Sequence, residues 1–322
     1  MHDNRKESTL IIRPFPFFSF CVVLLGLGLV LVCPGTLKAQ GAAPALSEEF
    51  ARWTVNGSVM HQFQSDLDRG GNFSVNRFFI NGRWSHPVNS NLSLGIGLRY
   101  AYEDYSFSDT VGFSGKPPWG EIHMPDLSLA AFYRTDSDWR FLAAATGGFS
   151  GESGADTGDS LIYGGILAAS RKFGPDLTLG LGAGIYRRFN ETSFFPLIFV
   201  KWKISEQWSV GNALQAGPTG PAGLELVYRP GEDWAFGLGG AYRSVRFRLD
   251  RDGMAPGGIG TEKSFPVWLR ATRRLTKTLN LDLYGGLLPG GELRIEDSSG
   301  RELSTDNYQT TPFMALSFSW RI

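Results

Sequence analysis

Three histidines are the first candidates for chemistry in this chain of 322 residues, because a hydrolase needs a nucleophile placed beside a base. They are His61, His86 and His123, and their polar neighbours in sequence are Ser58, Ser65 and Asp126. Such spacings occur in any chain, and His86 lies beside a predicted tight turn. Solvated or hydrogen-bonded histidines are the simpler interpretation, so we expect no enzyme and no catalytic residue.

Acidic and glycine-rich segments are the next candidates, for metal ions and phosphates. The stretch from Gly151 to Ser160 carries carboxylates that could hold calcium, but it lacks the ligand order of an EF-hand loop. Gly180 to Gly184 alternates glycines within a predicted strand and opens no helix, so it predicts no phosphate-binding loop. A solvated acidic loop is favoured, calcium binding by it stays open, and we predict no cofactor and no metal site.

The elements that position these side chains are predicted to be β-strands. The chain ends on a strict alternation in which Met314, Leu316, Phe318, Trp320 and Ile322 share one face and small or polar residues share the other. A period of two throws successive side chains to opposite faces of a sheet. A terminal strand with one uncovered apolar face is typical of a closed barrel in a bilayer, where closure leaves no backbone group unpaired in hydrocarbon.

Short and long connections alternate along the chain, and this rhythm predicts the topology. Outer-membrane barrels have tight turns at the periplasm and longer loops outside. Six short turns and seven longer segments then separate fourteen strands, with both termini periplasmic. The predicted strands are 51–64, 73–86, 91–105, 122–134, 139–149, 160–173, 177–188, 195–204, 208–216, 222–229, 234–249, 264–274, 279–288 and 311–322. The stretch from Glu292 to Ser304, which could be a hairpin above the membrane, leaves twelve or sixteen strands open.

Tryptophans support this topology independently. Six of the nine lie beside short turns or near the chain ends, at the predicted periplasmic rim: Trp53, Trp84, Trp139, Trp208, Trp234 and Trp320. Amphipathic indoles prefer the membrane interface, so we interpret them as an interfacial girdle.

Basic residues in mid-strand are assigned to the interior, because a charge on the lipid face costs about 2–4 kcal/mol at the bilayer midplane. The predicted lumen-facing set is Arg77, Arg83, Arg99, Arg134, Arg188, Lys201, Lys203, Arg229, Arg270 and Arg274, against the acidic Glu103, Glu225 and Asp282. A basic lining favours the passage of anions. The alternative is that these residues pair with acids from the loops and with one another, in a barrel that conducts little.

The N-terminal region has the pattern of a secretory signal peptide. Arg5, Lys6 and Arg13 precede a nearly uninterrupted apolar run from Phe17 to Val32, and small residues follow up to Ala39. We predict a signal peptide over residues 1–39 and a single barrel domain over residues 40–322. A retained membrane helix and a lipoprotein site at Cys33 are the alternatives. Both cysteines lie in this leader, so a cleaved chain would have no disulfide and no thiolate zinc site.

Composition agrees with a barrel. The 41 glycines and 24 phenylalanines disfavour helices and favour strands. The mean hydropathy of −0.12 fits a wall in which only alternate residues meet lipid. The formal net charge is zero and the chain has no signature of a nucleic-acid module, so nucleic acid is not an expected partner.

From Trp119 onwards, the chain resembles a family of outer-membrane β-barrel proteins classed as a domain of unknown function. The resemblance is carried by Pro118-Trp119-Gly120, the segment from Asp156 to Gly165, Phe195-Pro196 with Trp202 and Trp208, the segment from Gly223 to Tyr228, the run from Tyr242 to Asp250, and Gly290 to Leu293. It implies a barrel and no assigned activity, so no functional residue can be carried over. A terminal Ile322 stands where phenylalanine is usual in outer-membrane barrels.

The sequence therefore predicts an all-β, up-and-down antiparallel transmembrane barrel, exported to the outer membrane of a Gram-negative-type bacterium. A loosely porin-like passive channel for small polar or anionic solutes is the favoured function. A non-conducting structural or surface-interaction barrel is the alternative. The expected partners are outer-membrane lipid and the barrel-assembly machinery, which would bind the C-terminal strand.

Overall fold

The computed structural model describes residues 53–212, 217–218 and 223–322. The predicted signal peptide lies outside the described residues. The described residues belong to one compact unit. Within the described residues the secondary structure is strand throughout, apart from the single 3-10 turn η1 (Val111–Phe113).

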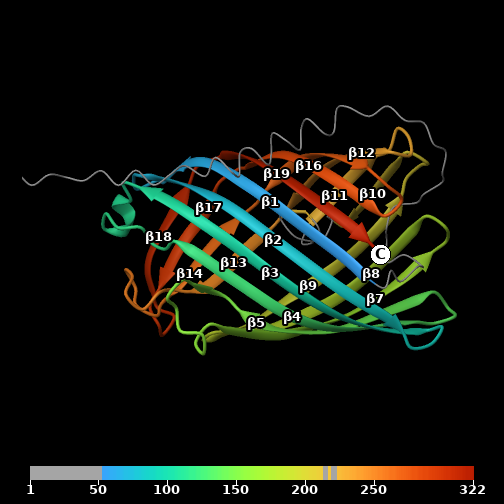
Figure 1. Cartoon of the computed structure of the whole chain (residues 1–322), viewed down its shortest axis with the longest axis horizontal. Helices are drawn as coiled ribbons and strands as arrows, with labels where there is room; N and C mark the ends of the chain where they lie inside the picture. Colours follow the sequence, from blue (N-terminus) through green and yellow to red (C-terminus); the bar gives the residue numbers. More distant parts are fainter. Residues whose placement is uncertain (1–52, 213–216, 219–222) are drawn as a thin grey trace, which may run out of the picture. The chain divides into compact units, whose positions relative to one another are not determined.

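Fourteen antiparallel strands form the wall of a closed barrel (Figure 1). Each wall strand pairs with the next, and β1 pairs with β19 through contacts such as Val59 with Leu316, which closes the barrel. The prediction of an all-β barrel of fourteen strands is confirmed. The wall strands are β1 (Trp53–Asp66), β2 (Asn72–Pro87), β3 (Leu92–Ser108), β4 (Glu121–Arg134), β5 (Trp139–Phe149), β7 (Leu161–Phe173), β8 (Leu177–Arg188), β9 (Glu191–Lys203), β10 (Trp208–Asn212), β11 (Gly223–Tyr228), β12 (Trp234–Ala241), β15 (Val267–Arg274), β16 (Leu279–Leu288) and β19 (Thr311–Arg321).

The side chains of the wall strands alternate between an apolar outer face and an inner face. In β8, Leu181 is 71% exposed, whereas Gly184 on the opposite face is buried. In β19, Ala315 and Ser317 are buried, whereas Trp320 on the outer face is 44% exposed. Exposed leucine and isoleucine side chains around a closed sheet require an apolar surrounding, so this outer surface fits a lipid bilayer.

Short turns lie at one end of the barrel, the end at which the C-terminus is seen in Figure 1. Several are closed by backbone hydrogen bonds across the turn, such as Thr135 N–H to the Trp139 carbonyl at 2.9 Å and Ile204 N–H to the Trp208 carbonyl at 2.9 Å. The six tryptophans of the predicted girdle lie at this end. Trp53 pairs across strands with Trp84, and Trp139, Trp208 and Trp234 are the first residues of their strands.

The opposite end carries four further strands that differ from the predicted pattern. They are β13 (Arg243–Arg248), β14 (Ile259–Ser264), β17 (Gly291–Glu296) and β18 (Glu302–Tyr308). The predicted strand 234–249 is therefore two strands. β14 lies in the connection predicted between strands 234–249 and 264–274, and β17 and β18 lie in the connection predicted between strands 279–288 and 311–322. Glu292 to Ser304 belongs to a hairpin outside the wall, which was the alternative left open above.

A bend in continuous hairpins explains these extra strands. β12 pairs with β15 up to Gly240 and Val267, and the same register continues from Arg243 and Ser264 in β13 and β14. Pro266 lies at the bend, where its missing N–H removes one donor from the ladder. The outer halves of these hairpins can therefore leave the direction of the wall.

The bend lets the outer strands close a second, smaller ring of strands. β12 pairs with β11, but its continuation β13 does not. β13 pairs instead with the short strand β6 (Gly151–Glu152), which in turn pairs with β4. The junction is made by the Arg248 N–H donating to the Ser150 carbonyl at 2.9 Å and the Ser150 hydroxyl donating to the Arg246 carbonyl at 2.9 Å. Pairing of β14 with β17 and of β17 with β18 completes the outer layer on that side.

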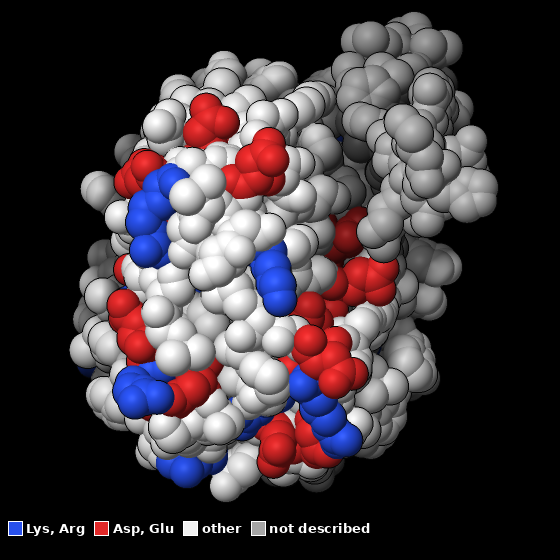
Figure 2. All heavy atoms as spheres, turned by 90° about the vertical axis from the view of Figure 1, so that its left-hand side faces the viewer, with Lys and Arg blue, Asp and Glu red and all other residues white. Residues whose placement is uncertain are grey.

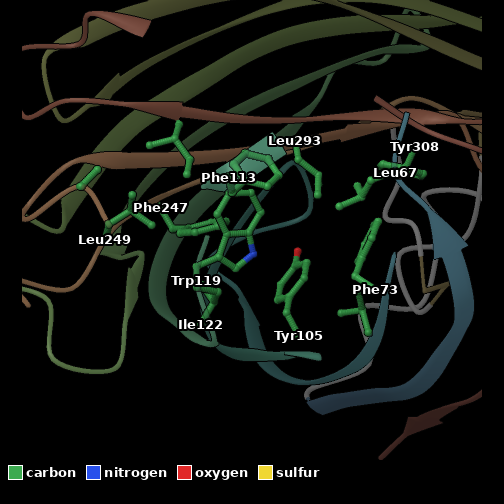
Figure 3. Packing of buried hydrophobic residues seen from close by; sticks show 13 residues of the cluster. Leu67, Phe73, Tyr105, Phe113, Trp119, Ile122, Phe247, Leu249, Leu293 and Tyr308 are labelled. Atoms are coloured by element: carbon green, nitrogen blue, oxygen red, sulfur yellow. The ribbon is translucent and has the colours of Figure 1, made fainter. Parts of the chain in front are cut away.

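A packed apolar cluster fills the inside of this second ring (Figure 3). Its members come from both the wall and the outer strands, and most are fully buried: Leu67, Phe73, Val75, Tyr105, Phe113, Trp119, Ile122, Phe247, Leu249, Ala255, Leu293, Ile295 and Tyr308. Trp119 stands edge-on to Phe247 at 5.1 Å and to Tyr105 at 5.7 Å between ring centroids. This part of the barrel is a solid core.

Candidate channel lumen

A buried set of four charges lies directly beneath the apolar cluster. Arg77 on β2 and Glu103 on β3 meet Arg243 on β13 and Glu262 on β14, and all four side chains are at most 11% exposed. Arg77 donates from Nη2 to both carboxylate oxygens of Glu262, at 2.8 and 2.9 Å. Arg243 donates to Glu262 at 2.7 Å and also to Glu103. We call these four residues the charge quartet.

The charge quartet is electrically neutral and its carboxylates receive further donors. The Tyr105 hydroxyl donates to Glu262 at 2.6 Å, and the Tyr308 hydroxyl donates to the same carboxylate at 3.2 Å. Burial alone would raise the pKa of Glu262, but Arg77 and Arg243 outweigh it and lower this pKa to about 2. The quartet therefore stays ionised near neutral pH and fixes β13 and β14 to the wall strands β2 and β3.

A second buried ionic group lies on another stretch of the wall, formed by β11, β15 and β16. Arg270 on β15 donates to Glu225 on β11 at 2.6 and 2.9 Å, and to Asp282 on β16 at 3.1 Å. The Trp268 indole N–H donates to Glu225 at 2.9 Å. Arg270 is thereby paired with two carboxylates and is not available to bind a solute.

The predicted lumen-facing basic residues thus fall into different surroundings. Arg77 and Arg270 belong to the two buried groups. Arg99 has Asp126 as a loose partner at 3.9 Å, Lys203 pairs with Glu206 in the adjoining turn at 2.6 Å, and Arg229 donates to Ser209 at 2.8 Å. Lys201 lies between Val200 and Trp202 on β9 and pairs across strands with Gly211. Arg83, Arg134, Arg188 and Arg274 form no ion pair with a carboxylate of a described residue.

The half-buried inner face from β3 to β9 contrasts with the packed side. Arg99 keeps 52% of its side chain exposed although it shares a face with Gly97 and Ser93, and neighbouring inward residues on β5, β7 and β9 are also partly exposed. Inward side chains that remain exposed line a space that the protein does not fill. This stretch of wall is the candidate lumen.

Sequence reasoning missed the apolar and aromatic part of this inner face. Phe195, Leu197 and Phe199 alternate with the outward Phe194, Pro196 and Ile198 on β9. They oppose Gly184, Gly182 and Gly180 of β8. Both faces of β9 are apolar, so hydrophobicity alone could not separate them. The signal that could have found the inner set is the run of glycines on the neighbouring strand.

The histidines are placed apart from one another. His61 shares a hydrogen bond of 2.8 Å with Asn76, and His123 contacts the hydroxyls of Tyr100 and Ser153 at 2.7 and 3.0 Å. His86 stacks on Trp84 at the turn end. These contacts join no histidine to both a nucleophile and a carboxylate.

The loop-bearing end carries charged side chains of both signs. Figure 2 shows acidic and basic side chains intermingled on this face, with uncharged atoms of described residues filling its middle. One shallow hollow of about 350 Å³ lies between Lys116, Trp119, Glu152 and Met254. The Glu152 carboxylate accepts the Gly120 and Asp250 N–H groups at 2.7 and 2.9 Å, so it ties two loops together.

Two further observations concern the described residues alone. Among them, no group of three or more His, Cys, Asp or Glu side chains is arranged to hold a metal ion. No helix in that part of the chain has the length and apolar composition needed to cross a bilayer.

The closed sheet, the apolar outer face and the polar groups inside define a membrane-spanning β-barrel of the outer-membrane type. Residues 114–321 match the family described as Domain of unknown function (DUF6268), which covers more than half of the sequence. The chain belongs to this family, as the resemblance read from the sequence implied.

Several solved structures are similar to this chain at low sequence identity. An outer membrane channel from Pseudomonas putida F1 matches with a TM-score of 0.48 and 10% identity, over 90% of this chain and all of that chain. The TodX monoaromatic hydrocarbon channel, as its deltaS2 mutant, matches with a TM-score of 0.41 and 9% identity, over 84% and 90%. The KdgM porin in complex with oligogalacturonate matches with a TM-score of 0.32 and 10% identity, over 83% and 99%. No curated protein matches the chain. Similarity at this level assigns no solute to this chain.

Proposed function

We propose that this protein is a passive channel of the outer membrane that favours small anionic solutes. The observation that carries the proposal is an imbalance of charge on the inner wall. The buried arginines Arg77 and Arg270 are matched by buried carboxylates, whereas Arg83 and Arg188 form no ion pair with a described carboxylate. Positive charge that the protein does not neutralise raises the local concentration of anions.

The rest of the proposal follows from the type of barrel. Residues 1–39 serve as a cleaved signal peptide, the C-terminal strand is bound by the barrel-assembly machinery, and the tryptophans at the turn end lie at the periplasmic interface. Exposed indoles beside tight turns support this orientation. No enzymatic step is included in the proposal.

A non-conducting barrel is the second candidate, and one observation favours it. The apolar cluster and the charge quartet fill the region inside the second ring, so that side of the barrel offers no path. The channel proposal therefore routes solutes along the half-exposed inner face of β3 to β9.

A charge reversal on the inner wall tests the proposal. In a salt gradient across a planar bilayer, the parent protein should prefer chloride over potassium. Arg83→Glu should shift the reversal potential toward cations, most strongly at low salt, where screening is weak. Arg171→Glu is the matched control, since Arg171 lies on the outer face of β7 above Trp139. An equal shift in both variants, or in neither, would contradict an anion-favouring lumen.

A further inference from the structure

The inner wall of β8 and β9 carries a flat surface made of two aromatic rings and one cation. Tyr186 and Phe195 stack with 5.8 Å between ring centroids and 25° between ring planes. The Arg188 guanidinium lies over the Tyr186 ring, 5.7 Å from its centroid. We call Tyr186, Phe195 and Arg188 the aromatic platform.

Glycines on neighbouring strands hold the two rings flat against the wall. Gly164 on β7 pairs with Tyr186, and Gly184 on β8 pairs with Phe195. A Cβ atom at either glycine would overlap the ring that lies over it. Each ring therefore lies against the backbone of the neighbouring strand, on the inner face of the wall. Both rings remain half-buried rather than buried.

The charge around the aromatic platform has a positive excess. The nearby Glu191 carboxylate is engaged by Arg246 of β13, and Arg246 also pairs with Glu296 at 2.5 Å. Arg248 lies over the Phe189 ring at 4.8 Å. Glu191 faces Arg188 across the strands but is engaged by Arg246, and no described carboxylate lies within ion-pair distance of Arg188, so the carboxylate of a solute can pair with its guanidinium. A guanidinium fork matches a carboxylate in shape and charge.

We propose that the aromatic platform is a binding subsite for a small solute that joins a flat ring to a carboxylate. The ring stacks on Tyr186 and Phe195, and the carboxylate meets Arg188. This inference deepens the proposed function by naming a solute class, and it rests on that function only for the route by which the solute reaches the interior. Ring stacking and the ion pair act together, so neither an uncharged ring nor a small carboxylate without a ring satisfies the subsite.

Equilibrium binding of benzoate to the refolded full-length protein in detergent tests the inference apart from conductance. Benzoate should bind more tightly than benzyl alcohol, which lacks the charge, and than acetate, which lacks the ring. Changing Tyr186→Leu and Phe195→Leu together keeps apolar bulk on the wall but removes both flat rings. This double variant should bind benzoate about tenfold more weakly, since stacking contributes on the order of one decade in affinity.

Two further variants make the outcome specific. Arg188→Gln should lower benzoate affinity to that of benzyl alcohol. Phe194→Leu is the matched control, because Phe194 lies next to Phe195 in sequence but faces outward and is 72% exposed. It should bind like the parent.

Every outcome decides the inference. Equal binding of all three probes, or equal affinity in the parent and the Leu double variant, would overturn it. A parent that binds benzoate as expected but does not conduct would support the platform and refute the channel. A parent that conducts but shows no platform-dependent binding would leave the channel standing and refute the platform.

Discussion

Glu262→Gln is the sharpest test of how the outer strands are fastened to the barrel. Glu262 is fully buried and accepts hydrogen bonds from Arg77, Arg243, Tyr105 and Tyr308. Removing its charge leaves two buried arginines against the single carboxylate of Glu103. Removing one partner of a buried ion pair costs about 3–5 kcal/mol.

The lowered pKa of Glu262 reflects the same ion pairs and gives a magnitude of the same order. Its lowering from 4.5 to about 2 corresponds to roughly 3 kcal/mol of preference for the charged form, at about 1.4 kcal/mol per unit. A carboxylate whose pKa is lower in the folded state stabilises the fold above its unfolded pKa. That contribution is lost as pH falls through the folded pKa. The free energy of unfolding of the parent should therefore fall by about 3 kcal/mol between pH 4.5 and 2. The Glu262→Gln variant should lack this contribution at every pH, because its side chain carries no charge.

Denaturant unfolding in detergent, followed by tryptophan fluorescence, measures both effects. Glu302→Gln is the matched control in the same outer layer, because Glu302 is half-exposed and its pairing with Arg294 at 3.4 Å is worth under about 1 kcal/mol. If Glu262→Gln lost no more stability than Glu302→Gln, the charge quartet would not be what fixes β13 and β14 to the wall.

Two further predictions concern assembly and orientation. Changing Phe318 and Trp320 together to serine should impair folding into vesicles, seen as loss of heat-modifiable migration on gels, because β19 loses lipid-facing area and its interfacial anchor. The inner-face change of Ser317 and Ser319 to alanine should have a much smaller effect, since it removes little beyond the 2.9 Å hydrogen bond from Ser317 to Ser58. Equal insertion of the two double variants would show that the faces of β19 are misassigned. Cysteines placed at Ser137 and Gln207, in turns at the tryptophan-bearing end, should react only from the periplasmic side, and labelling of intact cells at either position would invert the orientation.

The wall could be predicted from the sequence because its rules are local. Alternation fixes the face of each side chain, so Leu316 and Ser317 could be assigned to opposite faces without knowledge of any partner strand. The short turns likewise fixed the number of wall strands, because each joins two neighbours through a few residues.

The interior could not be predicted, because its partners are distant in sequence. Arg77 and Glu262 are 185 residues apart, and Arg243 and Glu103 are 140 residues apart. Alternation assigned the basic residues to the interior, but nothing local indicates that Arg77 and Arg270 are matched by buried acids whereas Arg188 forms no such ion pair. The position of β13 could not be predicted for the same reason. β13 follows β12 in sequence, yet it pairs with β6, which is distant in sequence.

The conductance of the purified parent protein in a planar bilayer shows whether the barrel is a channel. We expect discrete conductance steps in symmetrical potassium chloride and, in a salt gradient, a reversal potential displaced toward that of chloride. Insertion that is verified by heat-modifiable migration but produces no steps would contradict the channel and favour a structural barrel. Steps with a reversal potential displaced toward that of potassium would contradict an inner wall that favours anions.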